Sequence, residues 1–333
     1  MNWKFWKRRR ESLVDPQDPQ WERTLMGRIA SDYVRERRQR RRWGNLFKLL
    51  LIGYLFAVLI AFYAEDLAER VGGEGHTSLV KVDGVIGADA EASADRVVGS
   101  LRKAFEDEAT KGVILRINSP GGSPVQAGYI NDEVHRLKEK YREEHDEEMP
   151  VYAVAMDLCA SGGYYVAVAA DEIYVDKASL VGSIGVRIDS FGLDKVLEDL
   201  DIERRLMTAG ENKGILDPFS PMSEAQRQYI QGVLDQLHGQ FIAAVKAGRG
   251  DRLQGGDELF SGLFWTGEQA VELGLADGLG SASYVARELI GAETIVDYTQ
   301  EWDLIERLSR RMGTTAASAL KGMIEVLDLP AMR

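Results

Sequence analysis

Two side chains that carry much of protein chemistry are scarce in this chain. Among its 333 residues there is one cysteine, Cys159, and there are four histidines. A single cysteine excludes an intramolecular disulfide framework and any metal site built from several cysteines. Because Cys159 lies in an apolar run, we expect a packed small side chain rather than a nucleophile. We expect neither a metal ion nor another cofactor.

The few histidines also lie in places that do not suit a catalytic imidazole. His76 lies in a Gly-rich linker, His135 and His145 lie on a charged helical segment, and His238 lies within a long helical segment. None of them follows a predicted strand in a loop, where a catalytic histidine is usually held. A Ser-His-Asp triad is therefore disfavoured, and a serine nucleophile would need another base.

Acidic residues are scarce at the N-terminus, although the chain as a whole is acidic. Residues 1–48 contain 14 Lys/Arg and 6 Asp/Glu, a net charge of +8, whereas the whole chain carries −12. Residues 49–333 therefore carry −20. This division predicts that the two parts of the chain face different environments.

A polar face is missing from residues 46–64, an apolar run interrupted only by Lys48. Its length is close to the roughly 20 residues that cross a membrane as a helix. The arginine-rich segment 35–42 before it predicts a single-pass signal anchor with a cytoplasmic N-terminus. A cleaved signal peptide is disfavoured, because the preceding region is too long and no small-residue cleavage site follows. Nucleic-acid binding by the arginines is less favoured than contact with anionic lipid.

The chain therefore divides into five predicted parts. A basic cytoplasmic arm (1–45) precedes the transmembrane signal anchor (46–64), and a linker (65–76) leads to a soluble domain (77–298). Residues 299–333 have the spacing of amphipathic helices. These helices could pack on the domain, on a neighbouring subunit or on the membrane surface.

Strands and helices alternate in the predicted soluble domain, which indicates an α/β fold with a largely parallel sheet. The predicted strands or extended pieces are 78–85, 112–117, 151–156, 171–175, 180–188 and 202–207. The predicted helices are 94–108, 125–148, 164–170, 223–247, 266–273 and 282–290.

A serine lies at one of the predicted strand-to-helix turns. Ser161, in the small-residue stretch Leu158–Tyr165, follows the buried strand 151–156 and precedes an Ala-rich helix. The backbone N–H groups at a helix N-terminus can stabilise the oxyanion formed when a serine attacks a carbonyl. The alternative is that Ser161 is an N-cap in a tight turn.

A lysine can replace histidine as the base when it loses part of its preference for charge. The candidate is Lys213, in a Gly-flanked loop after the predicted strand 202–207, although most lysines in such loops are solvated. Two glycine-rich turns could complete the site: Asn118–Gly122, after a buried strand, and Val181–Val186, which contains Ser183. A phosphate loop is disfavoured, because no lysine follows Gly121-Gly122 at the required spacing.

Four motifs together resemble the signal peptide peptidase A family of membrane-anchored serine peptidases. They are Asn118–Gly122, Ala160–Tyr165, Gly182–Val186 and Gly210–Gly214, in the order and spacing of that family. The resemblance covers about residues 77–290. It differs at Asn212, where the family commonly has Tyr or His before the lysine.

The resemblance implies a role for each residue that matches a motif. Ser161 corresponds to the nucleophile and Lys213 to the general base of a Ser-Lys dyad, and Ser183 corresponds to a serine that orients the lysine. The backbone N–H groups of the oxyanion region correspond to those near Gly121, Gly122 and Gly162.

The resemblance also implies a fold, an assembly and a function. The fold would be that of the Clp-protease/crotonase superfamily, built from repeated β-β-α units and here preceded by a single transmembrane helix. The chain would form a homo-oligomeric ring whose serine and lysine come from neighbouring subunits. It would be a serine endopeptidase of the bacterial inner membrane, with its catalytic domain periplasmic or extracellular. Its substrates would be cleaved signal peptides and other apolar peptides, and it would bind the lipid bilayer but no nucleic acid.

Two other functions are compatible with the same residues. One is a crotonase-like acyl-thioester enzyme that uses the oxyanion scaffold, and the other is a non-catalytic membrane-bound scaffold that binds peptides or partners. A dyad lysine must be neutral to accept a proton, so the peptidase hypothesis predicts activity that rises toward alkaline pH.

Overall fold

The computed structural model describes residues 75–300, a helical segment at residues 43–58 and 60, and the isolated positions 23, 26, 27, 30 and 33. The chain forms two units, residues 1–72 and residues 73–333. Most of the predicted basic arm, residues 59 and 61–64 of the predicted anchor, and all of the predicted C-terminal helices beyond residue 300 lie outside the described residues.

The first unit is represented by the helical segment at residues 43–58 and 60, whose side chains are exposed. This segment contains most of the apolar run in which the anchor is predicted. In the described part of the chain, no helix has both the length and the apolar character needed to cross a membrane.

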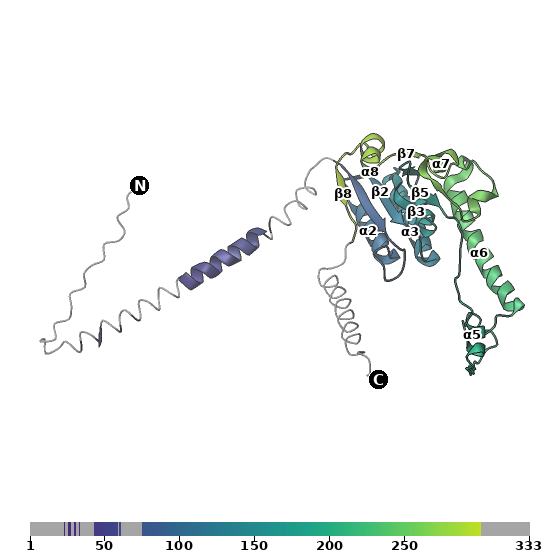
Figure 1. Cartoon of the computed structure of the whole chain (residues 1–333). Helices are drawn as coiled ribbons and strands as arrows, with labels where there is room; N and C mark the ends of the chain where they lie inside the picture. Colours follow the sequence, from purple (N-terminus) through teal and green to yellow (C-terminus); the bar gives the residue numbers. More distant parts are fainter. Residues whose placement is uncertain are drawn as a thin grey trace. The chain divides into compact units, whose positions relative to one another are not determined.

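The second unit is built on a mixed sheet with the strand order β6-β5-β3-β2-β1-β8 (Figure 1). All neighbours in this order are parallel except β5 and β6, which are antiparallel. In the described residues the strands are β1 (His76–Asp83), β2 (Thr110–Ser119), β3 (Val151–Ala160), β4 (Glu172–Val175), β5 (Leu180–Gly182), β6 (Phe264–Thr266), β7 (Gly278–Leu279) and β8 (Ile295–Asp297).

Helices connect most of the strands, as the alternation in the sequence predicts. They are α2 (Ala94–Glu106), α3 (Pro124–His145), α4 (Gly162–Ala167), α5 (Asp194–Asp199), α6 (Glu224–Arg249), α7 (Gly267–Glu272) and α8 (Ala282–Tyr284). Three further short turns of helix are η1 (Gly250–Arg252), η2 (Asp257–Phe260) and η3 (Val285–Ile290), the last of which is a π-helix.

The central strands are buried on both faces, which explains why their sequences are almost continuously apolar. On β2, Val113, Leu115 and Ile117 belong to the larger core cluster, which includes the buried residues of α2, α3 and α4. Ile114 points to the opposite face and packs with Val285 in a smaller cluster. The predicted α/β class is confirmed, because helices cover both faces of a largely parallel sheet.

Strand β3 is shared between two sets of neighbours. Its first half, at residues 152–154, pairs with β4, and its last residues, 158–160, pair with β5. The β2–β3 register shifts between Ile117 and Ser119, next to this division. Such irregularities bend a strand and re-aim the residues that follow it. Here the strand leads directly to Ser161.

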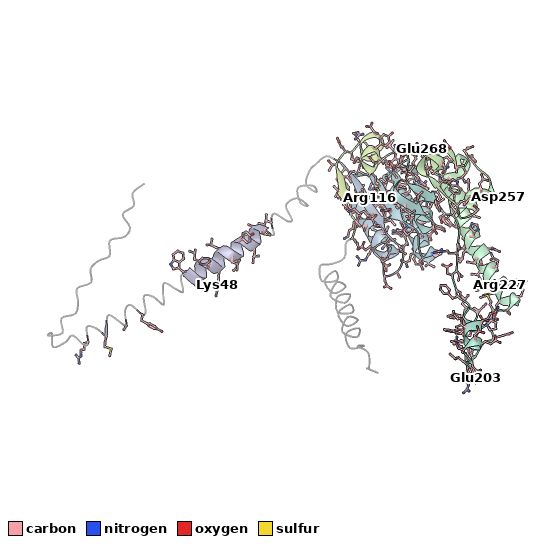
Figure 2. All side chains as sticks on the ribbon, in the orientation of Figure 1. Lys48, Arg116, Glu203, Arg227, Asp257 and Glu268 are labelled. Atoms are coloured by element: carbon pink, nitrogen blue, oxygen red, sulfur yellow. The ribbon has the colours of Figure 1, made fainter. Side chains whose placement is uncertain are left out.

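The segment between β5 and α6 differs from the prediction. Residues 202–207 do not form a strand; they are irregular and exposed, because no other strand lies beside them to pair with their backbone groups. They belong to an outer lobe (residues 188–222) that contains the unpredicted helix α5 and lies at the N-terminal end of α6 (Figure 1). Figure 2 places Glu203 in this lobe and Arg227 on the outer part of α6.

The other end of α6 is packed tightly into the domain. A Cβ atom on Gly248 would lie 2.1 Å from the carbonyl oxygen of Val168, at the end of α4. The buried Arg249 guanidinium donates to both carboxylate oxygens of Asp277, at 2.6 and 3.0 Å. Helix α6 is therefore held against α4, the helix that begins directly after Ser161.

Candidate active site

Three neighbouring parallel strands bring the glycine turns and the two serines together. Strands β2, β3 and β5 are adjacent in the sheet, so their carboxyl ends meet at one edge. Gly121-Gly122 follows β2, Ser161 follows β3 and Ser183 follows β5. The motifs that are far apart in the sequence therefore line the same cavity.

Ser161 has a backbone conformation that an ordinary serine avoids. Its φ is 52° and its ψ is −122°, whereas most residues with a side chain keep φ negative. Its N–H donates to the carbonyl of Gly182 at 2.8 Å, and its own carbonyl accepts from the N–H of Tyr165 at 2.9 Å. Strained residues of this kind cluster at functional sites, and a nucleophilic serine on a strand-to-helix turn is one such case.

The side chain of Ser161 does not act as a helix cap. Although Ser161 occupies the N-cap position of α4, its hydroxyl accepts no capping hydrogen bond from that helix. Ser223 and Thr266, at the starts of α6 and α7, do make such bonds. The N-cap interpretation therefore explains the position of Ser161 but not its hydroxyl, which is left available for chemistry.

The glycines beside Ser161 allow the backbone to approach closely. A Cβ on Gly121 would lie 2.7 Å from the Ser161 Cβ and 2.6 Å from the Gly162 nitrogen. Gly121 has a φ of 98°, and its N–H is already used by Ser119 Oγ at 3.1 Å. Within the described residues, the N–H groups of Gly122 and Gly162 have no acceptor. The geometry thus favours these two as oxyanion donors.

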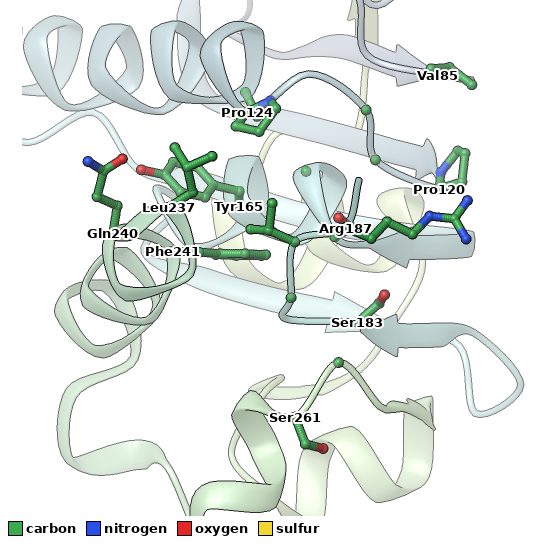
Figure 3. A pocket seen from close by; sticks show the side chains of 18 residues that line it. Val85, Pro120, Pro124, Tyr165, Ser183, Arg187, Leu237, Gln240, Phe241 and Ser261 are labelled. Atoms are coloured by element: carbon green, nitrogen blue, oxygen red, sulfur yellow. The ribbon is translucent and has the colours of Figure 1, made fainter. Parts of the chain in front are cut away.

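A cavity of about 810 Å³ opens at this edge of the sheet (Figure 3). Its wall includes Ser161, Ser183 and the predicted oxyanion glycines Gly121, Gly122 and Gly162. The cavity is therefore the common site of five of the six residues that the sequence predicts.

One end of the cavity is largely apolar, with the amide of Gln240 at its edge. Tyr165 on α4 packs against Phe241 on α6 with 5.0 Å between the ring centres, and Leu237 lies beside them (Figure 3). The buried Asn131 donates from Nδ2 to the Tyr165 carbonyl at 2.8 Å, which holds the start of α4 against α3. An apolar side chain of a ligand fits this end.

Lys213 is the predicted site residue that the structure does not bring to the cavity. It is exposed in the outer lobe, within a turn in which its N–H donates to the Gly210 carbonyl at 3.1 Å. No lysine lines the cavity wall that the described residues form, and Arg187 is the one charged residue in this wall. The cavity wall that the described residues of one chain form thus contains no base for Ser161.

The histidines and the cysteine do not supply a base for Ser161 in the cavity that the described residues form. None of the four histidines lines the cavity formed by the described residues. His238 comes nearest in the fold: its Nε2 donates to the Ile184 carbonyl at 3.1 Å, next to Ser183, a contact that its place in a helix did not predict. Cys159 packs in the core as expected, and burial raises the pKa of its thiol to about 12. In the described residues, no cluster of His, Cys, Asp or Glu could hold a metal ion.

Comparison with other proteins identifies related sequences. Two proteins named Na(+)/H(+) antiporter NhaA, from Brucella abortus and Brucella melitensis, are 42% identical to this chain over 193 residues. The match covers 58% of this chain but 25% of each relative, so the chain spans about a quarter of their length. Most of the sequence of each named protein therefore lies outside the match.

A putative signal peptide peptidase SppA from Enterococcus faecium matches over more of its length. It is 30% identical over 252 residues, which cover 72% of this chain and 71% of that protein. Among solved structures, a mutant of a membrane-bound stomatin-specific protease in complex with a substrate peptide aligns with a TM-score of 0.42 at 14% identity. That alignment covers 72% of this chain and 98% of the solved one.

A family model identifies the same group of proteins. The model of peptidase family S49 matches residues 143–294, which contain Ser161, Ser183 and Lys213. This match and the extent of the match to the Enterococcus protein show that the chain belongs to peptidase family S49.

Proposed function

We propose that this protein is a serine endopeptidase that hydrolyses apolar peptides, including cleaved signal peptides, through an acyl-enzyme. The observation that carries the proposal is the position of Ser161. It lies on a strained turn, in a cavity with one apolar end, beside two backbone N–H groups without an acceptor among the described residues. Membership of a peptidase family supports this chemistry.

The proposed reaction begins with attack by Ser161 Oγ on the scissile carbonyl carbon. The neutral amine of Lys213 accepts the hydroxyl proton, and the carbonyl oxygen becomes an oxyanion that the N–H groups of Gly122 and Gly162 stabilise. When the tetrahedral intermediate collapses, the C–N bond breaks and the leaving amine takes the proton from Lys213. Water, deprotonated by the same lysine, then attacks the acyl carbon. The bond from this carbon to Ser161 Oγ breaks, and Oγ takes the proton back from Lys213.

We further propose that Lys213 acts on the Ser161 of a neighbouring copy in a ring. Two observations support this. Lys213 is exposed and does not line the cavity of its own chain. The outer lobe that carries it also exposes large apolar side chains, among them Phe191 at 80% and Met207 at 92%. An apolar surface of this kind is typical of a protein–protein contact.

The membrane anchor belongs to the same proposal. The apolar run 46–64 and the arginine-rich segment before it support a single-pass anchor in a bacterial inner membrane, with the catalytic domain on the outer side. The finer assignment of the fold to the Clp-protease/crotonase type also belongs to this proposal, and the four motifs that resemble the signal peptide peptidase A family support it.

The proposal is tested with the full-length protein in detergent and a fluorophosphonate probe, together with turnover of an apolar peptide. We expect Ser161→Ala to abolish labelling, and both Ser161→Ala and Lys213→Ala to lower turnover about 10³-fold or more. Full labelling of Ser161→Ala would show that another residue is the nucleophile. Turnover that survives Lys213→Ala would show that another residue is the base.

Mixing the two inactive variants tests the ring. If serine and lysine come from different copies, co-expression of Ser161→Ala with Lys213→Ala restores part of the activity, because some pairs then combine an intact serine with an intact lysine. If both come from one copy, the mixture stays inactive.

A further inference from the structure

The cavity has a second chemical character besides its apolar end. Arg187, five residues beyond the end of β5, is the one ionised side chain in the wall that the described residues form. In Figure 3 its guanidinium points toward Pro120, whereas Tyr165, Leu237 and Phe241 gather at the other end, beside the neutral amide of Gln240. The two ends of the cavity therefore differ: one is largely apolar and uncharged, and the other is positively charged.

The guanidinium of Arg187 is available to a ligand. Its Nε lies 3.5 Å from Oδ2 of Asp189, but the two side chains are 87% and 71% exposed. Exposed pairs of this kind contribute little, because water and salt screen them. By contrast, Arg249 is buried and committed to Asp277 by two short hydrogen bonds. Arg187 can therefore exchange its contact with Asp189 for a contact with another anion.

The charge of Arg187 also stands out against the charge of the domain. Residues 49–333 carry a net charge of −20, so their overall field disfavours anionic ligands. A guanidinium presents several N–H donors in a fork that matches a carboxylate in geometry and charge. Arg187 thus offers a carboxylate a positive group inside the cavity, where no other charged side chain lines the wall that the described residues form.

We propose that Arg187 is a specificity residue that binds a carboxylate of the peptide substrate while the opposite end of the cavity holds an apolar side chain. The inference rests on the proposed peptidase function and names the substrate class more closely. The preferred peptide has an apolar residue at one side of the scissile bond and a carboxylate at a defined distance from it. That carboxylate is either a Glu or Asp side chain or the free C-terminus of the peptide.

The test uses full-length protein in detergent and peptides that share one apolar core. One set carries Glu or Gln at successive positions on both sides of the scissile bond, and another has a free or an amidated C-terminus. In the wild type we expect one Glu position, or the free C-terminus, to raise kcat/KM about fivefold over its neutral counterpart, the scale of an exposed charge pair. Because salt screens such pairs, this preference falls as ionic strength rises.

Variants of Arg187 identify the cause of the preference. Arg187→Gln should remove it, and Arg187→Glu should reverse it, so that a peptide with Lys at the same position is cleaved faster than one with Glu. The matched control is Arg142→Glu, the same charge change at an exposed arginine on α3 outside the cavity. This control should keep the wild-type preference.

The outcomes separate this inference from the function on which it rests. If the ratio of kcat/KM for the Glu peptide to kcat/KM for the Gln peptide is the same in wild type, Arg187→Gln and Arg187→Glu, the role of Arg187 is overturned. This conclusion requires that the Gln peptide is cleaved by Ser161. A Gln peptide that is not cleaved, or is cleaved equally by Ser161→Ala, overturns the peptidase function instead. If Arg142→Glu changes the preference as much as Arg187→Glu does, the preference arises from overall charge, and the inference is also overturned.

Discussion

At the scale of single residues, the space around Ser161 determines which neighbours are possible. Gly121 has a positive φ, and a Cβ at this position would overlap Ser161 and Gly162. We expect Gly121→Ala to lower kcat about 10²-fold, because the clash moves Ser161, the proposed nucleophile, away from the proposed oxyanion donors. Steady-state turnover of an apolar peptide measures this loss.

The control for this substitution is another glycine of the same region. Gly128, on α3, has open space where its Cβ would lie, so Gly128→Ala should keep wild-type activity. It should also stabilise the helix by up to about 1 kcal/mol. Equal activity in the two variants would show that the backbone beside Ser161 tolerates a side chain after all.

The sequence predicted five residues of the cavity wall, because glycines and serines in turns after strands are a local signal. Ser161 and Gly122 each follow a strand that the sequence identifies, and neighbouring parallel strands end together. Ser183 lies within the predicted extended piece 180–188, which in the structure ends as a strand at Gly182. Arg187 could not be predicted, because its place depends on the path of an irregular segment after β5. The roles of Ser161 and Lys213 in catalysis stay predictions.

At the scale of elements, helix α6 depends on the glycine near its C-terminus. Because a Cβ on Gly248 would meet the backbone of Val168 at 2.1 Å, Gly248→Ala must push α6 away from α4. We expect a loss of about 1–3 kcal/mol in the free energy of unfolding, measured by urea denaturation. Gly239→Ala on the same helix has open space and should be neutral or stabilising. A stabilising effect of both variants would contradict the tight contact.

Helices α2 and α3 are joined by a carboxylate between two arginines. Hydrogen bonds from Arg136, and then from Arg102, lower the pKa of the buried Glu133 from 4.5 to about 2. A group with a lowered pKa stabilises the fold above its unfolded pKa and loses this contribution as pH falls toward the folded value.

We therefore expect Glu133→Gln to cost about 2 kcal/mol at pH 7. The difference from wild type should shrink between pH 4.5 and about 2, where Glu133 becomes protonated in the folded protein. Urea denaturation of both proteins across this range measures it. A difference that stays constant with pH would mean that the charge of Glu133 does not stabilise the contact between the helices.

The long elements were predictable, whereas the shortest strands at the edges of the sheet were not. The buried strands β1, β2 and β3 and the long helices α3 and α6 have a sustained hydrophobic pattern. Strands β6, β7 and β8 contain two or three residues each, which is too few for any period, and they form because other strands of the sheet lie beside them. Residues 202–207 have the composition of a strand but no neighbour to pair with.

At the scale of the whole molecule, the exposed apolar side chains of the outer lobe should hold copies of the chain together. We expect the double variant Phe191→Glu, Met207→Glu to dissociate the oligomer, because a charge placed in an apolar contact loses its hydration. Sedimentation or light scattering in detergent measures the mass, and peptide turnover should fall with it. The melting temperature of the double variant should stay close to the wild-type value, since both side chains are exposed. An active monomer would contradict the shared site.

The place of Lys213 outside the cavity of its own chain has a consequence for when the enzyme works. If the lysine of a neighbouring copy acts as the base for each serine, a newly made copy has no activity until it assembles with other copies. Specific activity then rises with the concentration of the protein, and assembly itself controls when peptides are cleaved. Dilution would switch it off reversibly, and one defective subunit would silence a neighbour whose own residues are intact.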